Sequence, residues 1–287
     1  MSDEQYQWRK MKNADEYAVE KLLRENEEKY VNACGRFLVR SGNDSVWVLS
    51  GKKNKIEALV INSRSALMPV LCGKEEIPKP GFLDSFFNRK KIHSVQGLLN
   101  EVILMEKYLE NSGRIIRDTF DYDLMSLDCG QLTIKSGQVS NKKEISNLVL
   151  MVPKLTDLDA ISPLQAAYEQ EEVLPFGSVF SPAASRINIT NIIANGQILA
   201  AQLNGRLVGK INVNAVSYTR YQVGGVYVHP GFRGLGIARK MALEFIESLI
   251  KQGKEVTLFV KKNNTAARRL YSGMGFNIKG DYRITYY

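Results

Sequence analysis

A strand that runs into a glycine-rich loop and then into a long helix is the feature that most constrains this sequence. Residues 225–238 read GVYVHPGFRGLGIA. Arg233, Gly234 and Gly236 form the loop, and apolar residues at helical spacing predict a helix over 234–252. Glycines let the backbone approach phosphate oxygens, and a helix N-terminus adds about half a positive charge. The segment therefore predicts a pyrophosphate site, and the alternative is a tight turn that needs glycine only for its shape.

Two common phosphate motifs do not fit this loop. A Walker loop needs G-K-[ST] after its glycines, and that sequence is absent. A dinucleotide-binding fold needs a third glycine, where Arg239 stands, and an acid at the end of the next strand. That strand ends in Phe259-Val260-Lys261, so the second motif fails as well.

The loop R-x-x-G-x-A after the strand V-Y-V resembles the acetyl-CoA-binding motif of the GNAT superfamily of N-acetyltransferases. After the strand VTLFV comes NNTAARRLYSGMGF, which resembles the N-x-x-A-x-x-L-Y-x-x-x-G-F of that family. The matching positions are Asn264, Ala267, Leu270, Tyr271, Gly275 and Phe276. The resemblance covers residues 146–287 and is strongest from 221 onward. It implies an α+β fold with a mixed, mostly antiparallel sheet flanked by helices.

The resemblance also implies a cosubstrate site for acetyl-CoA without a metal. Backbone groups of Val226, Tyr227 and Val228 would pair with the pantetheine arm, because an exposed strand edge accepts an extended amide chain. A bulge at Gly224-Gly225 would open that slot. The remaining cofactor-binding residues implied are Arg233, Gly234, Leu235, Gly236, Ile237 and Ala238 of the loop and Asn264.

Acetyl transfer needs a polarised thioester carbonyl, a neutral attacking amine and a proton for the leaving thiolate. A backbone N–H near residues 226–228 is the expected oxyanion donor, and the resemblance makes Tyr271 the acid, with a core aromatic as the alternative. The general base is not readable. Glu169, Glu171 and Glu172 end a helix where the acceptor side of this fold is built, although such a run is also typical of a solvated helix end. His229 is expected to pack or cap.

The spacing of apolar residues predicts the order of elements along the chain. In the first half we expect a helix over 15–31, a hairpin of 45–50 and 55–61, a third strand over 66–71, a turn at Gly97 and a long helix closed by Gly113. In the second half we expect strands over 148–152, 198–203, 207–215, 221–228 and 255–260, helices over 156–173, 185–197, 234–252 and 265–272, and a closing pair of strands over 276–278 and 282–286. Asn204-Gly205 is the strongest hairpin signal.

A length of 287 residues favours two domains. The polar, aperiodic segment 133–147 predicts a boundary, which gives an N-terminal α/β accessory domain over 1–145 and a GNAT catalytic domain over 146–287. The first half resembles the second loosely in its order of elements. It is either a degenerate GNAT-like unit that shapes the acceptor pocket or an unrelated α/β domain.

The leading hypothesis is an acetyl-CoA-dependent N-acetyltransferase that moves an acetyl group directly to a primary amine. The alternative is a non-catalytic acetyl-CoA-binding regulator.

Residues 148–287 hold 16 Lys and Arg against 9 Asp and Glu, a net charge of +7 out of +9 for the chain. Nucleic-acid binding still ranks last, because these cations are scattered. Three distant cysteines and a longest apolar run of only 148–153 predict a cytoplasmic protein without membrane contact, and the sequence leaves the oligomeric state open, a homodimer included.

Overall fold

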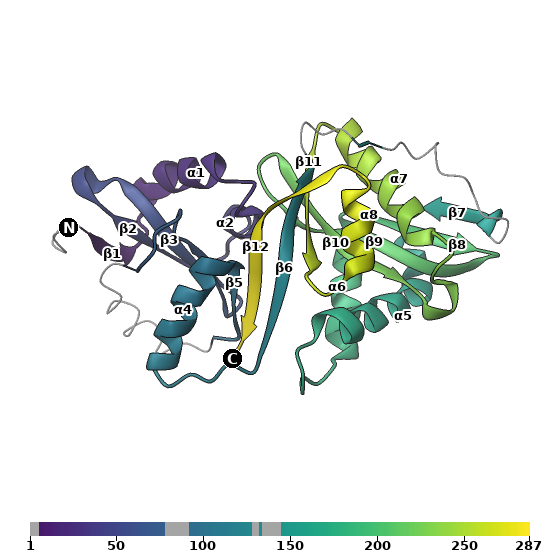
Figure 1. Ribbon diagram of the computed structural model, residues 1–287, viewed down its shortest axis with the longest axis horizontal. Coiled ribbons are helices and arrows are strands. Elements are labelled where there is room, and N and C mark those ends of the chain that lie inside the picture. The colour runs from purple at the N-terminus through teal and green to yellow at the C-terminus, as the bar shows by residue number, and fades with distance from the viewer. Residues whose placement is uncertain (1–5, 78–91, 128–131, 134–144) are drawn as a thin grey trace.

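One twelve-stranded sheet runs through the molecule in the computed structural model, which describes residues 6–77, 92–127, 132–133 and 145–287 (Figure 1). The strands of the first half are β1 (Gln7–Lys10), β2 (Ser45–Ser50), β3 (Ile56–Ser63), β4 (Ala66–Val70), β5 (Ser94–Leu98) and β6 (Asp118–Leu127). Those of the second half are β7 (Leu148–Met151), β8 (Ile198–Leu203), β9 (Arg206–Val216), β10 (Arg220–Val228), β11 (Glu255–Lys261) and β12 (Phe276–Tyr286).

Helices lie between these strands in both halves. The first half holds α1 (Glu16–Glu25), α2 (Val31–Leu38) and α4 (Leu99–Asn111). The second half holds α5 (Leu158–Tyr168), α6 (Pro182–Ala194), α7 (Ile237–Lys251) and α8 (Thr265–Ser272), and a π-helical turn, Glu169–Val173, continues α5. Among the described residues no helix is both long and apolar enough to cross a membrane.

The sheet consists of two units with the same topology. Its order is β1-β2-β3-β4-β5-β12-β6-β11-β10-β9-β8-β7. Each strand β1 to β6 of the first half has a counterpart among β7 to β12 of the second half, in the same order counted from the opposite end of the sheet. Strands β1 to β4 pair antiparallel and β4 with β5 parallel, and β7 to β10 and then β11 repeat this pattern. The first half is therefore a second unit of the same α+β architecture, which is one of the two alternatives that the sequence left open.

The two units exchange their last strands. β12 lies between β5 and β6, and β6 lies between β12 and β11, so each unit's sheet is completed by the other's final strand (Figure 1). β6 and β12 pair antiparallel from Asp118 with Tyr286 to Leu127 with Phe276. The halves are thus interleaved in one sheet. The predicted division between 145 and 146 stays a prediction, because residues 134–144 of the expected linker lie outside the described residues.

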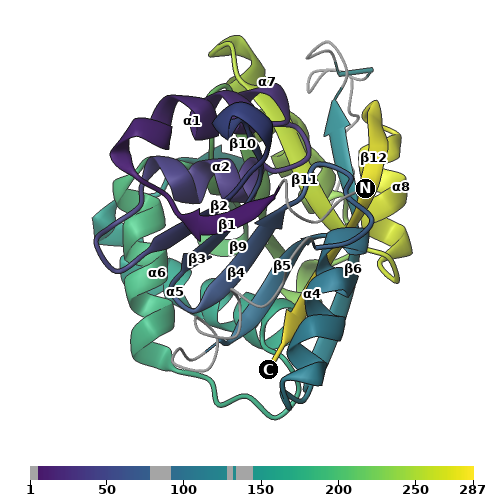
Figure 2. The same ribbon diagram turned by 90° about the vertical axis from the view of Figure 1, so that its left-hand side faces the viewer.

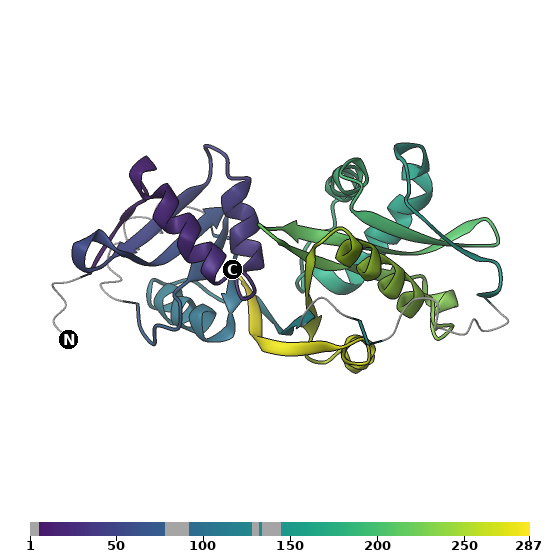
Figure 3. The same ribbon diagram turned by 90° about the horizontal axis from the view of Figure 1, so that it is seen from above.

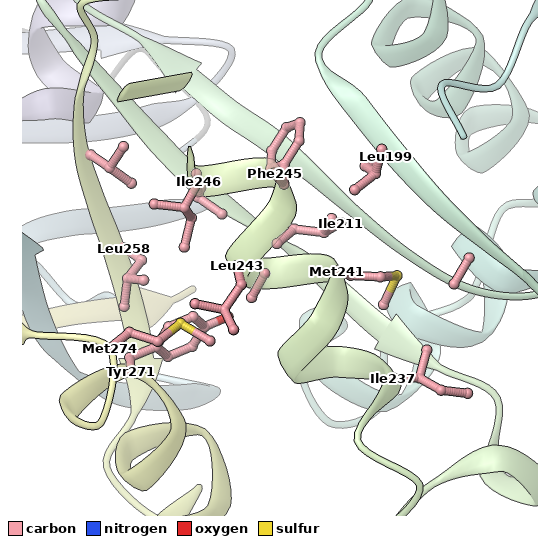
Figure 4. Close-up of a cluster of buried hydrophobic side chains, with 14 of the residues drawn as sticks. Leu199, Ile211, Ile237, Met241, Leu243, Phe245, Ile246, Leu258, Tyr271 and Met274 are labelled. Carbon is pink, nitrogen blue, oxygen red and sulfur yellow. The ribbon is translucent and has the colours of Figure 1, made fainter. Parts of the chain in front are cut away.

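Helices cover both faces of each unit, as Figures 2 and 3 show. In the first unit α1 and α2 pack on one face of the sheet and α4 on the other, because alternate strand residues point to opposite sides. In the second unit α5 and α6 cover one face, and α7 and α8 cover the other. Met241, Phe245 and Ile246 of α7 pack there in one cluster with Leu199 and Leu258 of the sheet (Figure 4).

The structure confirms most of the predicted elements. The hairpin at Asn204-Gly205 has both residues at positive φ, +49° and +80°, as a two-residue hairpin turn of type I′ requires. Gly113 follows α4 at a φ of +85°. The second helix of the second half, expected over 185–197, begins earlier, at Pro182, after Ser181 caps it with a hydrogen bond from the Ala184 N–H.

Four sequence expectations were wrong or incomplete. The helix expected over 15–31 is shorter, because α1 ends at Glu25, where the Asn26 side chain donates to the Leu22 carbonyl, and the separate helix α2 begins only at Val31. Gly97 lies inside β5 and is not a turn. The closing pair is one strand, β12, with a register shift between Ile278 and Gly280. β6 was missed.

β6 escaped prediction because its sequence, DTFDYDLMSL, contains aspartates, which are depleted in strands. The fold neutralises them with arginines. Arg283 of β12 donates to both carboxylate oxygens of Asp121 at 2.7 and 3.0 Å, and Arg268 of α8 lies 2.5 Å from the buried Asp123 carboxylate. Ion pairs with arginines of β12 and α8 therefore allow this aspartate-containing segment to form a strand.

The units also meet through the Glu27 carboxylate, which follows α1. It accepts hydrogen bonds from the Thr219 N–H at 2.8 Å and the Arg220 N–H at 3.0 Å, and from the hydroxyls of Ser217 and Thr219. Although burial raises the pKa of Glu27, these hydrogen bonds together lower it. Nearby, Gly35 of α2 lets the helix approach β9 closely, because a Cβ there would lie 2.7 Å from the Val216 carbonyl oxygen.

Candidate active site

The parallel strands β10 and β11 separate part-way along their length. They pair only from Arg220 with Glu255 to Val223 with Leu258. Beyond that point the register of β10 against β9 shifts between Gly224 and Tyr227, which is the predicted bulge. Gly225 has a φ of +59°, and a Cβ on it would lie 1.9 Å from Asn212 Oδ1, so the bulge requires glycine at this position.

After Val223 the edge of β10 is no longer paired with β11, and this stretch between the two strands is called the slot below. The His229 N–H donates to the Val208 carbonyl of β9 at 2.9 Å. Because alternate residues of a strand direct their backbone groups to opposite sides, Val228 and Val226 direct theirs toward β11. The Val228 carbonyl accepts a hydrogen bond from Arg233 Nε at 2.9 Å. The Val226 N–H is therefore a donor at the mouth of the slot.

The loop after β10 presents backbone rather than side chains. Gly234 and Gly236 lie at φ +78° and +87°, and a Cβ on either would meet no heavy atom within 4 Å. Gly236 is the N-cap of α7, whose first N–H groups have no partner within the helix. Ile237 is buried in the core, and Leu235 and Ala238 pack against it. These side chains of the loop thus pack into the core, and its backbone at the two glycines is not covered by neighbouring side chains, as an anion site at a helix N-terminus requires.

Arg233 contacts the π-helical turn. Its guanidinium donates to Glu171 Oε2 at 2.7 Å, and its Cζ lies 5.4 Å from the centre of the Tyr227 ring. The Tyr227 hydroxyl donates to the other oxygen of Glu171 at 2.6 Å. The hydrogen bonds from Tyr227 and Arg233 hold the pKa of Glu171 below its ordinary value. Arg233 is half exposed, so an incoming anion can compete for it.

Tyr271 and Asn264 are held by the structure of α8. The Asn264 side chain accepts a hydrogen bond from the Ala267 N–H at 3.0 Å and so caps the helix. Tyr271 is 5% exposed and lies in the core near Met274 and Leu243 (Figure 4). Its ring packs edge-on against Phe276. Burial raises the pKa of Tyr271, so its hydroxyl keeps its proton at neutral pH.

A cleft of about 400 Å³ opens between the π-helical turn and the start of α8. Its lining residues are Glu171, Glu172, Lys261, Asn263, Asn264, Thr265 and Ala266. The Glu172 carboxylate lies 3.2 Å from the Lys261 ammonium group. Of the three glutamates singled out in the sequence, two therefore line the cleft, and Glu169 instead accepts hydrogen bonds from Gln165 and Asn188 at 2.7 and 3.0 Å. π-Helical turns are frequent at functional sites.

Lys210 of β9 is the site residue that the sequence analysis missed. Its side chain is 0% exposed, and its Nζ donates to the Gly225 carbonyl at 2.8 Å and to Asn212 Oδ1 at 2.9 Å. Burial lowers the pKa of Lys210 to about 7, against a smaller opposing effect of Glu169. The available signal was the run Lys210, Asn212 and Asn214, which marks one polar face of a strand. The sequence alone does not reveal that α5 covers this face.

His229 takes the capping role expected of it. Its Nδ1 accepts a hydrogen bond from the Gly231 N–H at 3.2 Å, and its ring packs edge-on against Phe232. No group of three or more His, Cys, Asp or Glu side chains in the described part of the chain is placed to hold a metal ion.

The same fold is present in solved acetyltransferases. A GCN5-related N-acetyltransferase from Sphaerobacter thermophilus matches 98% of this chain and 94% of its own at a TM-score of 0.65 and 17% identity. A GNAT-family acetyltransferase from Colwellia psychrerythraea matches 98% of both chains at 0.56 and 13%. A tandem GNAT protein from the clavulanic acid biosynthesis pathway matches 98% of this chain and 97% of its own at 0.59 and 11%. A comparison with curated proteins found no match.

Residues 165–276 match the family model described as Acetyltransferase (GNAT) family. The family match is thus confined to residues 165–276, and the whole chain has a fold consistent with two GNAT-like units.

The buried amine of Lys210 should make stability depend on pH. Its pKa is about 7 in the folded chain against an ordinary value of 10.5, so between these values the unfolded chain binds one more proton. The free energy of unfolding of the wild type, minus that of Lys210→Met, should therefore rise by about 1.4 kcal/mol per pH unit from pH 7 toward pH 9. Urea titrations of both proteins at several pH values measure this difference. A difference that stays constant would show that Lys210 is protonated in the folded chain.

Proposed function

We propose that this protein transfers the acetyl group of acetyl-CoA directly to a primary amine. The observation that carries the proposal is the separation of β10 and β11 directly before an open glycine loop at the N-terminus of α7. The loop amides of residues 234–238 would hold the pyrophosphate, and the pantetheine arm would extend along the β10 edge at residues 226–228. The thioester would then lie at the point where the strands part.

The groups that the transfer needs would lie around that point. The Val226 N–H would donate to the oxygen that becomes negative when the amine attacks. Tyr271, still protonated at neutral pH, would supply the proton for the departing CoA thiolate. The bond from nitrogen to the carbonyl carbon forms first, the carbon–sulfur bond then breaks, and the proton that the nitrogen loses to solvent balances the one that Tyr271 gives to the thiolate and regains from solvent. The acceptor would enter through the cleft beside the π-helical turn.

Arg233 would link cofactor binding to the acceptor cleft, because its guanidinium is bonded to Glu171, which lines that cleft. A bound pyrophosphate would attract this guanidinium away from Glu171, because phosphate offers more negative charge. The Glu171 carboxylate would then face the cleft with Tyr227 as its remaining partner and could hold the ammonium form of the acceptor.

The first unit is not expected to bind a second CoA. The loop after β4 corresponds in topology to the glycine loop after β10. There the buried Glu101 carboxylate of α4 interacts with the backbone at residues 71–73 and accepts a hydrogen bond from the Tyr30 hydroxyl at 2.5 Å. A carboxylate of the chain itself thus already interacts with the backbone of this loop.

Removing the Arg233 side chain should weaken acetyl-CoA binding. Loss of a charged phosphate contact costs about 1.5–3 kcal/mol, and we expect the lower part of this range because Glu171 competes for the same guanidinium. Calorimetric titration of Arg233→Ala with acetyl-CoA measures the change, and one site per wild-type chain is expected. Lys251→Ala removes the same charge from the far end of α7 and is the control. Equal affinity in Arg233→Ala and Lys251→Ala would contradict the loop assignment.

Removing the Tyr271 hydroxyl should slow turnover but leave binding intact. A general acid contributes roughly 10²–10⁴-fold, so kcat of Tyr271→Phe should fall by at least about tenfold while the Kd for acetyl-CoA is unchanged. Thiol release with a panel of primary amines measures kcat. Tyr287→Phe, which changes another buried tyrosine in the other unit, is the control. Full activity of Tyr271→Phe would exclude the acid role, and tight binding without thiol release by the wild type would favour a non-catalytic acetyl-CoA-binding protein.

A further inference from the structure

Lys210 and the oxyanion donor are connected through one peptide group. The Gly225 carbonyl that accepts the hydrogen bond from Lys210 Nζ belongs to the same planar amide as the Val226 N–H. A hydrogen bond donated to an amide carbonyl draws electrons toward oxygen and makes the N–H of that amide a stronger donor. Lys210 thus acts on one end of the amide whose other end faces the slot.

The surroundings of Lys210 hold it in this position. Asn212, its second acceptor, is itself fixed by donating to Asn214 Oδ1 at 2.8 Å. The Lys210 Nζ lies 4.6 Å from the centre of the Tyr168 ring of α5. The Gly225 backbone also interacts with the Tyr168 hydroxyl. The bulge residue is therefore held by the buried Lys210 side chain and the partly buried Tyr168 side chain, on the face opposite α7.

The charged and titratable groups that face Lys210 come from three elements. α5 contributes Tyr168, and burial raises the pKa of its hydroxyl to about 12. The π-helical turn contributes Glu169, whose negative charge favours the protonated amine. β10 contributes Tyr227, the cross-strand partner of Lys210, and the Tyr227 hydroxyl is bonded to Glu171. Lys210, whose pKa burial lowers to about 7, is hydrogen-bonded to the bulge residue Gly225.

A buried lysine costs more free energy of folding than an apolar side chain at the same position would. Burying an amine costs free energy unless it is well paired, and replacing buried polar groups by apolar ones of similar volume is often neutral or stabilising. Packing alone therefore does not account for Lys210, whereas a role in the reaction does.

We propose that Lys210 is a positioning residue that fixes the bulge and polarises the Gly225–Val226 amide, so that the Val226 N–H binds the oxyanion more strongly. This inference rests on the proposed acetyl transfer and adds a residue to its machinery. The effect should be greater when Lys210 is protonated, because a cationic donor makes a stronger hydrogen bond than a neutral one.

The test measures the strength of hydrogen bonding to the carbonyl oxygen of the bound thioester. Difference infrared spectroscopy of acetyl-CoA labelled with ¹³C at the acetyl carbonyl reports how strongly that oxygen is hydrogen-bonded in the complex. In the wild type we expect the carbonyl band to lie below its frequency in water, and further below at pH 6 than at pH 9. In Lys210→Met the displacement should be smaller and independent of pH, while Lys251→Met should match the wild type.

Turnover gives a second readout. We expect kcat of Lys210→Met to fall by about tenfold with an unchanged KM for acetyl-CoA, less than the roughly 10²–10³-fold that follows loss of an oxyanion donor itself. If Lys210→Met does not fold, the pH dependence of the wild-type band decides alone. A pH-independent band in the wild type, or equal bands in the wild type and Lys210→Met, would overturn the role of Lys210 and leave the acetyl transfer standing. Failure of the wild type to bind acetyl-CoA would overturn both.

Discussion

The interruption of pairing between β10 and β11 is the constraint on which the candidate site depends. A regular pair of parallel strands would hydrogen-bond along its whole length and leave no edge for a ligand. Here pairing stops after Val223, and the bulge at Gly225 is held by Lys210 and Tyr168 instead of a neighbouring strand. The open glycine loop and the buried amine lie beside this one break in the sheet.

The local parts of the site could be predicted from the sequence because they rest on short patterns. Glycine at positions 225, 234 and 236 and the cap at Asn264 are dictated by backbone conformation and by the first turn of a helix. The ion pair of Arg233 with Glu171 and the burial of Lys210 could not be predicted, because they depend on how α5 and its π-helical turn pack over the sheet. A lysine in a strand is ordinarily a surface residue.

The same distinction applies to the fold. Hairpins and amphipathic helices were predicted from periodicity, whereas β6 became a strand through pairing with strands more than a hundred residues away. Its aspartates are tolerated because Arg268 and Arg283 neutralise them. The exchange of β6 and β12 makes the first unit part of the sheet that carries the site (Figure 1). Stability of the first unit is thereby linked to the geometry of the second.

Hydrogen–deuterium exchange with and without acetyl-CoA tests the central claim most directly, because it locates the ligand on the chain. The account predicts slower exchange of backbone amides in residues 224–238, at the β10 edge and the glycine loop, and no change over the corresponding residues 66–73 of the first unit. Protection confined to the first unit, or protection in neither loop at saturating acetyl-CoA, would contradict the assignment of the cofactor site to the second unit.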